Sequence, residues 1–139
     1  MAGVTRFDSR ALDQSVLSFL TERHLATLTT LRRNGSPHVV PVGFTFEPAT
    51  ATARVITSGH SVKARNAGRE GAIAALCQVD RARWLTLSGP IRVEADADAV
   101  ADAVERYTGR YRVPRANLDR VVLIMDVTAI LGTVGPSAS

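Results

Sequence analysis

The stretch LATLTTLRRNGSPHVVPVGFTFE, residues 25–47, has the pattern of a β-hairpin. Its first part, residues 25–31, is rich in Leu and Thr, and the Asn34-Gly35 pair follows. This pair favours a tight type I′ turn, because both central residues of that turn need positive φ. Residues 37–47 are then the returning strand. The hairpin therefore predicts an antiparallel sheet with one face toward a core.

The returning strand has two unlike faces. Alternation puts its larger side chains on one face, which we expect to face the core: His38, Val40, Val42, Phe44 and Phe46. The other face carries smaller side chains: Val39, Pro41, Gly43 and Thr45. Pro41 cannot donate a ladder hydrogen bond, so the strand is expected at a sheet edge or with a bulge. Either a planar ring lies on the small face, or Pro41 and Gly43 bend the strand; the sequence leaves both open.

The remaining chain alternates short strands with helices. Further strands are expected at residues 53–58, 72–79, 83–95 and 120–134, with a bulge or corner at Gly89-Pro90. Helices are expected from Asp8 or Ser9 to about His24, from Ser61 to about Gly68, and from Asp96 or Asp98 to before Pro114. Six strands with hairpin connections and flanking helices predict a single α+β domain over residues 1–139, built on an antiparallel barrel, with the terminal SAS as a tail.

Composition narrows the function classes. The net charge is +4 and the isoelectric point near 10.2, but arginines lie scattered among acids and aromatic residues make up only 5%, so no nucleic-acid partner is expected. No apolar leader or bilayer-long apolar run is present, which predicts no membrane partner and a cytoplasmic location. The sequence shows no metal-binding or nucleophile motif around its single cysteine, Cys77, or around its histidines, His24, His38 and His60. We therefore predict no metal ligand and no catalytic residue.

The segment SGHSVKARN, residues 58–66, holds Lys63, the single lysine among 17 Lys and Arg residues. Ser61 can cap a helix on which Lys63 and Asn66, three residues apart, share a face. Serine hydroxyls, free amide groups at a helix start, an ammonium and a carboxamide together suit a phosphate or carboxylate. The alternative is a lysine on a solvated helix face. With no acid, base or nucleophile in evidence, a bound cofactor would carry any reaction, which suits hydride transfer.

Three stretches together resemble one enzyme family: residues 25–48, then ARVITSGHSVKARN, then ALCQVDRARWLTLSGPIRV. Their order is similar to that of the split β-barrel flavin and deazaflavin oxidoreductases, the superfamily of pyridoxamine 5′-phosphate oxidase. The resemblance runs from about Leu12 to Gly132, and is strongest to the branch that uses the deazaflavin coenzyme F420. It implies a six-stranded antiparallel split β-barrel with flanking helices and a homodimer with cofactor sites at the subunit interface.

The resemblance also implies residue roles. It assigns the cofactor's phosphate side to Ser61, Lys63 and Asn66, with Thr57 and Ser58 at the preceding strand end. It assigns the ring to Val39, Val40 and Pro41, and contacts near the interface to Gln78 and Trp84. The anionic oligoglutamate tail of F420 could attract Arg54, Arg65 or Arg69.

The activity implied is hydride transfer from reduced F420 to a small conjugated acceptor, with biliverdin, reduced to bilirubin, as the expected bilin substrate. The C-terminal ILGTVGPSAS lacks the arginine and tryptophan motif of the pyridoxal phosphate-forming oxidase, which argues against pyridoxine chemistry. Two alternatives remain: an FMN-dependent reductase of the same fold, and a non-enzymatic module that binds a cofactor or tetrapyrrole.

Overall fold

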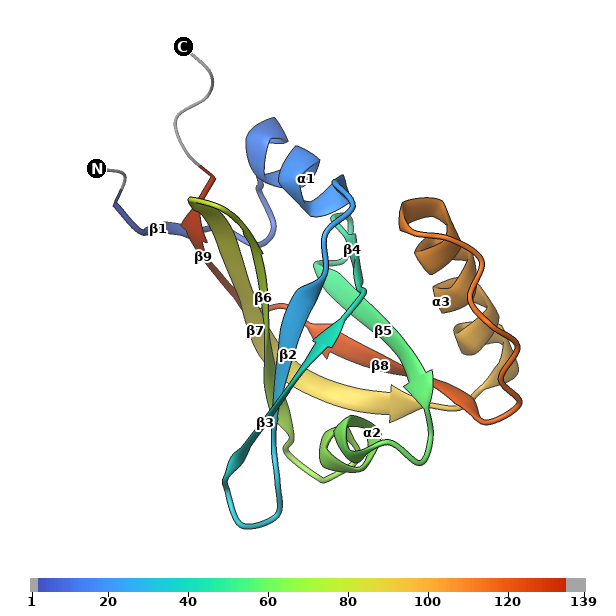
Figure 1. Ribbon diagram of the computed structural model, residues 1–139. Helices are drawn as coiled ribbons and strands as arrows, with labels where there is room; N and C mark the ends of the chain where they lie inside the picture. Colours follow the sequence, from blue (N-terminus) through green and yellow to red (C-terminus); the bar gives the residue numbers. More distant parts are fainter. Residues whose placement is uncertain (1–2, 135–139) are drawn as a thin grey trace.

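The computed structural model describes residues 3–134, so the SAS sequence lies outside the described residues (Figure 1). These residues form three helices: α1 (Gln14–Thr21), α2 (Val62–Ala67) and α3 (Ala97–Arg110). They also form nine strands: β1 (Thr5–Phe7), β2 (Ala26–Leu31), β3 (Pro37–Val42), β4 (Thr45–Glu47), β5 (Thr52–Ser58), β6 (Ile73–Asp80), β7 (Arg83–Glu94), β8 (Arg120–Asp126) and β9 (Ala129–Thr133). An α+β fold with flanking helices is thereby confirmed.

All strand pairs in the described sheet are antiparallel, in the order β3-β2-β6-β7-β8-β5-β4, and β9 pairs with both β7 and β1. The sheet curves around the core, with α1 and α2 at opposite ends and α3 alongside β5 and β8 (Figure 1). β3 and β4 end the order without pairing with each other, so the described strands do not close into a barrel.

Residues 3–134 form nine strands, whereas six were predicted. Two of the predicted strands are each divided into two, and one strand was not predicted. The returning strand breaks at Gly43-Phe44 into β3 and β4, and the last strand breaks at Val127-Thr128 into β8 and β9. β1 has three residues, too few for the alternation on which the prediction relied. The prediction of an edge strand is confirmed, because β3 has β2 as its one partner in the sheet order.

Burial explains the apolar run of β8. Its side chains face a core on both sides of the sheet. Leu123 and Met125 lie in the main core, while Val122 and Ile124 pack with Ala103 of α3. The sequence of a strand that is covered on both faces shows a continuous run of apolar residues, and not an alternation of apolar and polar residues.

The corner predicted at Gly89-Pro90 is present. β7 pairs with β9 through Trp84–Ser88 and with β8 from Ile91 onward, so the strand passes from one partner to the other at this point. A Cβ on Gly89 would lie 1.9 Å from the carbonyl oxygen of Asp126. Gly89 therefore permits the close backbone approach at which the sheet changes direction.

Two local predictions are wrong. The N-cap of α1 is Asp13, whose carboxylate accepts from the amide of Val16 at 3.1 Å, and Asp8 instead caps a preceding turn by accepting from the amide of Arg10. The hairpin turn is not type I′, since Gly35 (φ 85°) has positive φ but Asn34 does not. The Gly35 amide donates to the carbonyl of Arg32, and the Asn34 side chain accepts from Ser36. The five-residue loop therefore uses its one glycine for the positive φ.

No helix within residues 3–134 is long and apolar enough to cross a bilayer.

Gly89 and Gly109 provide a matched test of the corner. Gly89→Ala should lower the free energy of unfolding by about 3 kcal/mol or more, because backbone must move to admit the methyl group. Gly109 lies in α3, and a Cβ added to it would have no atom within 4 Å, so Gly109→Ala should raise stability by about 0.5–1 kcal/mol. Urea denaturation measures both; equal effects of the two substitutions would contradict the role assigned to Gly89.

Candidate functional site

A cleft of about 250 Å³ lies between β3, β5, α2 and the segment that follows α3. We call it the Lys63 cleft; its lining is Pro41, Val42, Gly43, Ile56, Thr57, Lys63, Tyr107, Pro114, Asn117 and Arg120. Two of these side chains are cationic and none is acidic. Pro41, Thr57 and Lys63, predicted from the sequence, thus meet in one cleft.

The end of β5 positions Lys63. Ser61 is the N-cap of α2, as predicted, and its hydroxyl accepts from the amide of Ala64 at 3.2 Å and donates to the carbonyl of Ser58 at 2.9 Å. Thr57 donates to the same hydroxyl at 3.1 Å. The Ser61 hydroxyl is therefore occupied in fixing the start of α2, and Lys63 follows in the first turn.

Lys63 is half-buried and has no carboxylate within ion-pair distance among the described residues. Burial lowers the pKa of its ammonium below the usual range, and no partner offsets that effect. An unpaired cation in a partly desolvated position is well suited to bind an anion.

Gly43 explains how the opposite side of the cleft packs. A Cβ at this residue would lie 2.9 Å from Cε2 of Tyr107 and 3.1 Å from Cε2 of Tyr111. The two tyrosine rings are 4.9 Å apart. The missing side chain therefore admits the chain's own tyrosines at the break between β3 and β4, which favours the bend over the ring platform for Gly43. Pro41 still lines the cleft.

Asn66 faces away from the Lys63 cleft. It is buried, its Nδ2 donates to the hydroxyl of Thr30 at 3.0 Å, and its Oδ1 accepts from Arg69 at 2.9 Å. It lines a separate cavity of about 310 Å³ that we call the arginine cavity, together with Arg32, Arg33, Asn34, Val62, Arg65 and Arg69. The structure therefore does not bring Lys63 and Asn66 together, because the bond to β2 turns the carboxamide toward the sheet.

Comparison with known proteins places the chain in a family. Residues 12–133 match the family model described as pyridoxamine 5′-phosphate oxidase. The chain belongs to this family. It is 57% identical over 122 residues, 88% of each chain, to the F420H(2)-dependent biliverdin reductase of Mycobacterium tuberculosis.

Solved structures show the same fold at low sequence identity. An F420 reductase is 23% identical with a TM-score of 0.67, covering 81% of this chain and 93% of its own. A putative pyridoxamine 5′-phosphate oxidase from Listeria innocua is 15% identical with a TM-score of 0.69, covering 86% of this chain and 96% of its own.

The other residues that the family resemblance singled out are dispersed. Val39 is exposed on the outer sheet face and Val40 packs against the main core. Trp84 is half-buried and pairs with Val79 across β6 and β7. Ser58 pairs with Arg120 across β5 and β8. Whether these family-implied contacts are made stays a prediction.

Gln78 is fully buried and its amide is bonded within the chain. Its Nε2 donates to the carbonyl of Phe19 at 2.8 Å, and its Oε1 accepts from Arg110 at 2.6 Å. These bonds join β6 to α1 and α3. They give Gln78 a packing role, and a contact with a cofactor stays a prediction for it.

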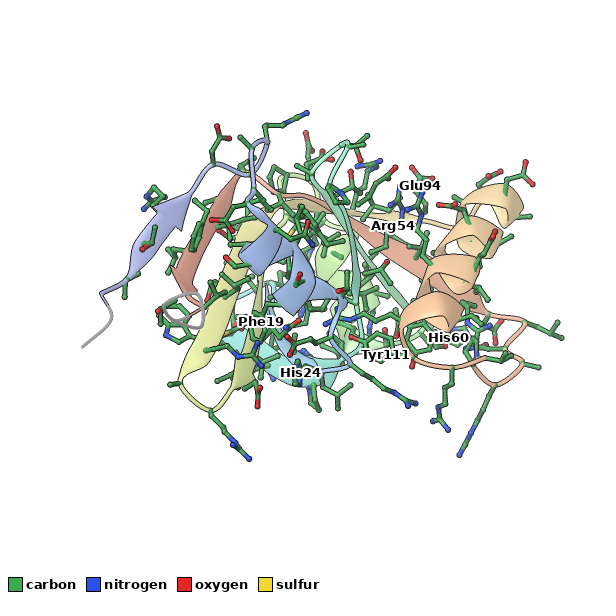
Figure 2. The ribbon with its side chains drawn as sticks, turned by 90° about the horizontal axis from the view of Figure 1, so that it is seen from above. Phe19, His24, Arg54, His60, Glu94 and Tyr111 are labelled. Carbon is green, nitrogen blue, oxygen red and sulfur yellow. The ribbon has the colours of Figure 1, made fainter. Side chains whose placement is uncertain are left out.

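Arg54 is already paired, unlike the other arginines proposed for the cofactor tail. Its guanidinium lies 2.9 Å from Glu47 and 3.7 Å from Asp102, whereas Arg65 and Arg69 line the arginine cavity. Arg54 lies beside the first half of α3, at Asp102, whereas Tyr111 follows its C-terminal end (Figure 2). Arg54 is therefore engaged in packing α3 on the sheet.

The sequence analysis missed a cluster of possible metal ligands, because Asp80 is distant in the chain from Glu22 and His24. Ligand atoms of Glu22, His24 and Asp80 lie within 4.8 Å of one another. Arg83 binds both carboxylates, with both Glu22 oxygens at 2.8 Å. The bond from Arg83, and secondarily that from His24, lowers the pKa of Glu22 to about 2. The carboxylates of the cluster are thus already bonded to the Arg83 guanidinium.

Arg110 was also missed, since nothing in GRYR distinguishes it from the other arginines. It is partly buried, and it donates to the carbonyls of Glu22 (2.7 Å) and Phe44 (2.6 Å) as well as to Gln78. Burial lowers its pKa, and the described residues place no carboxylate in ion-pair distance of it. Its partners are structural, in contrast to Lys63.

Lys63 and Arg110 should respond differently to the same substitution. Lys63→Met should change the free energy of unfolding by no more than about 0.5 kcal/mol, because the ammonium has no partner to lose. Arg110→Met should cost about 2–4 kcal/mol, because it leaves carbonyl groups and Gln78 without their donor. Thermal unfolding of the ligand-free chain measures both, and a large loss for Lys63→Met would indicate a structural lysine.

Proposed function

We propose that this chain is an F420-dependent reductase that transfers a hydride from the reduced deazaflavin to a conjugated acceptor, with biliverdin reduced to bilirubin. The observation that carries the proposal is the half-buried Lys63 in a cleft whose lining has no acidic side chain, in a chain 57% identical to a biliverdin reductase that uses this cofactor. A cytoplasmic location stays a prediction from the sequence.

The residues of the cleft fit a phosphate-bearing ring cofactor. Lys63 would pair with the phosphate, since no carboxylate among residues 3–134 pairs with the half-buried ammonium. Ser61 would fix the helix start, with Thr57 and Ser58 beside it. Pro41 would contact the ring, with Val39 and Val40 on the same strand. The family implies the same roles.

The arginine cavity suits the anionic tail of the cofactor. Arg32, Arg33, Arg65 and Arg69 make no ion pair among the described residues. Arg69 is held by bonds to Asn66 and to the carbonyl of Leu31, so its guanidinium has a fixed place. Asn66 would then act on the cofactor through Arg69, and not by the direct phosphate contact that the family pattern implies.

When bound, the reduced deazaflavin supplies the hydride. The acceptor would gain that hydride at an electrophilic carbon and a proton at a heteroatom, which is a two-electron reduction. The chain's own residues bind and orient, and no side chain of the cleft is assigned as acid or base. Solvent provides the proton in this scheme. Holding both reactants in contact is the main contribution of the protein.

A homodimer belongs to the same proposal. The Lys63 cleft, at about 250 Å³, falls below the roughly 300–1,000 Å³ of typical ligand pockets. The outer face of β2, β3, β6 and β7 carries only small or apolar side chains at its alternating positions: Thr27, Thr29, Leu31, Val39, Pro41, Ile73, Ala75, Cys77, Val79, Trp84, Thr86 and Ser88. A second copy seated on this face would enlarge the site and bury the apolar surface.

Titration with F420 and with FMN tests the cofactor choice. The wild-type chain should bind F420 more tightly than FMN, and Lys63→Met should weaken F420 binding at least about tenfold, the usual size of a lost charged hydrogen bond. Absorbance or fluorescence of the cofactor gives the dissociation constants. Tighter binding of FMN would favour the FMN reductase.

Turnover is tested by mixing the wild-type chain with reduced F420 and biliverdin. We expect reoxidation of the cofactor well above the rate without protein. Tight cofactor binding without turnover of any conjugated acceptor would instead favour the non-enzymatic module.

The sheet face is tested by adding a charge to it. Ile73→Glu should convert a dimer into monomers, because a carboxylate buried between two copies lacks a partner. Val4 is equally exposed, at 64% against 58% for Ile73, but precedes β1, so Val4→Glu should leave the assembly unchanged. Sedimentation velocity measures the mass, and a wild-type monomer would contradict the proposed dimer.

A further inference from the structure

The segment between α3 and β8, residues 111–119, forms a wall of the Lys63 cleft that the cofactor assignment does not use. It contributes Pro114 and Asn117, and Arg120 follows directly at the start of β8. Lys63 and the arginine cavity both belong to the surroundings of α2. The segment offers a second set of polar groups to the same cleft.

The segment 111–119 is bonded to the loop between β5 and α2. The amide of Gly59 donates to the carbonyl of Asp119 at 2.8 Å, and Nε2 of His60 lies 3.3 Å from Oδ2 of Asp119. A Cβ on Gly59 would lie 3.3 Å from the Asp119 carbonyl oxygen, so the absence of a side chain permits this approach. The wall and the start of α2 are thereby held in a defined relation across the cleft.

Arg120 is positioned by its own backbone and by its side chain. Its amide donates to the carbonyl of Asn117 at 3.3 Å, and its Nη2 donates to the carbonyl of Arg115. The side chain of Asn117 accepts from the amide of Asp119 at 2.9 Å, which fixes the turn before β8. Arg120 has no carboxylate within ion-pair distance among residues 3–134. Its guanidinium is partly exposed in the cleft and retains donors for a ligand.

Two apolar side chains of the same segment are left uncovered. Val113 is 75% exposed and Leu118 is fully exposed, although both lie within a few residues of the cleft-lining Pro114 and Asn117. Uncovered apolar side chains in the segment next to a cation that has no carboxylate partner among residues 3–134 suit a ligand with an apolar body and an anionic group.

We propose that Arg120, with Asn117, binds a carboxylate of the conjugated acceptor, and that the segment from residue 111 to 119 determines substrate specificity. The inference rests on the proposed reductase function. A guanidinium binds a carboxylate through two parallel hydrogen bonds, which orients the acceptor as well as holding it. Leu118 and Val113 cover the apolar part of the same molecule.

The test compares biliverdin with its dimethyl ester on wild-type protein and on R120Q. Loss of a charged hydrogen bond should raise KM for biliverdin about 10–100-fold in R120Q. The KM of the wild-type chain for the ester should be similar to the KM of R120Q for biliverdin. R120Q should not raise the KM for the ester further. R120K, which keeps the charge, should recover part of the loss. Equilibrium binding of both bilins to the protein with oxidised F420 should show the same pattern.

Arg112→Gln is the matched control, since Arg112 is exposed in the same segment but does not line the cleft. It should leave KM and F420 affinity within about twofold of wild type. R120Q should also leave the dissociation constant of F420 unchanged. Weaker F420 binding in R120Q, or an equal loss for biliverdin and the ester, would overturn the assignment of Arg120 to the acceptor.

The two proposals fail in different ways. If the wild-type chain does not turn over biliverdin, the proposed function fails, while bilin binding still tests Arg120. If it turns over biliverdin and the dimethyl ester with equal KM, the reductase function stands and the carboxylate site is wrong. This last comparison needs no variant, so it decides the question even if R120Q does not fold.

Discussion

Arg110 joins segments that lie far apart in the sequence. Its guanidinium binds carbonyls at the end of α1 and at the break between β3 and β4, and it also binds Gln78 of β6. The rings of Phe44 and Tyr111 lie 4.7 Å and 5.0 Å from it. Tyr111 adds a bond from its hydroxyl to the carbonyl of His24 at 2.7 Å. The C-terminal end of α3 is thus fixed, and with it the starting point of the segment that walls the cleft.

Six of the cations described above differ in the partners that they bind. Arg110 is surrounded by carbonyl groups and aromatic faces, while Arg54, Arg83 and Arg106 bind carboxylates. Lys63 and Arg120 line one cleft, and among residues 3–134 neither has a carboxylate within ion-pair distance. Exposed ion pairs contribute little to stability, so the three arginines that bind carboxylates mainly orient helices and turns. The positions of Lys63 and Arg120 are better explained by a ligand than by folding.

Local chemistry made part of this structure predictable. The Ser61 cap, the edge position of β3 and the corner at Gly89 follow from what one residue can do with its backbone. The N-cap of α1 was harder to predict, because Asp8 and Asp13 offer the same capping group and only packing selects between them. The orientations of Asn66 and Arg110 were out of reach, because they depend on contacts with distant segments. Arg120 is held by residues near it in the chain, but only the fold places it in the same cleft as Lys63. The Thr30 hydroxyl, 36 residues away in the chain, decides where Asn66 points.

Pro41 links the cleft to the apolar sheet face. It lines the Lys63 cleft, and it alternates with Val39 on the outer face of the edge strand. In the proposed dimer a second copy on that face would remove water from this side of the cleft. Lower effective dielectric strengthens the attraction of Lys63 for the cofactor phosphate and of Arg120 for the acceptor carboxylate, while an empty cleft would leave both cations desolvated. Ligand binding and assembly would then favour each other, because each offsets a cost that the other creates.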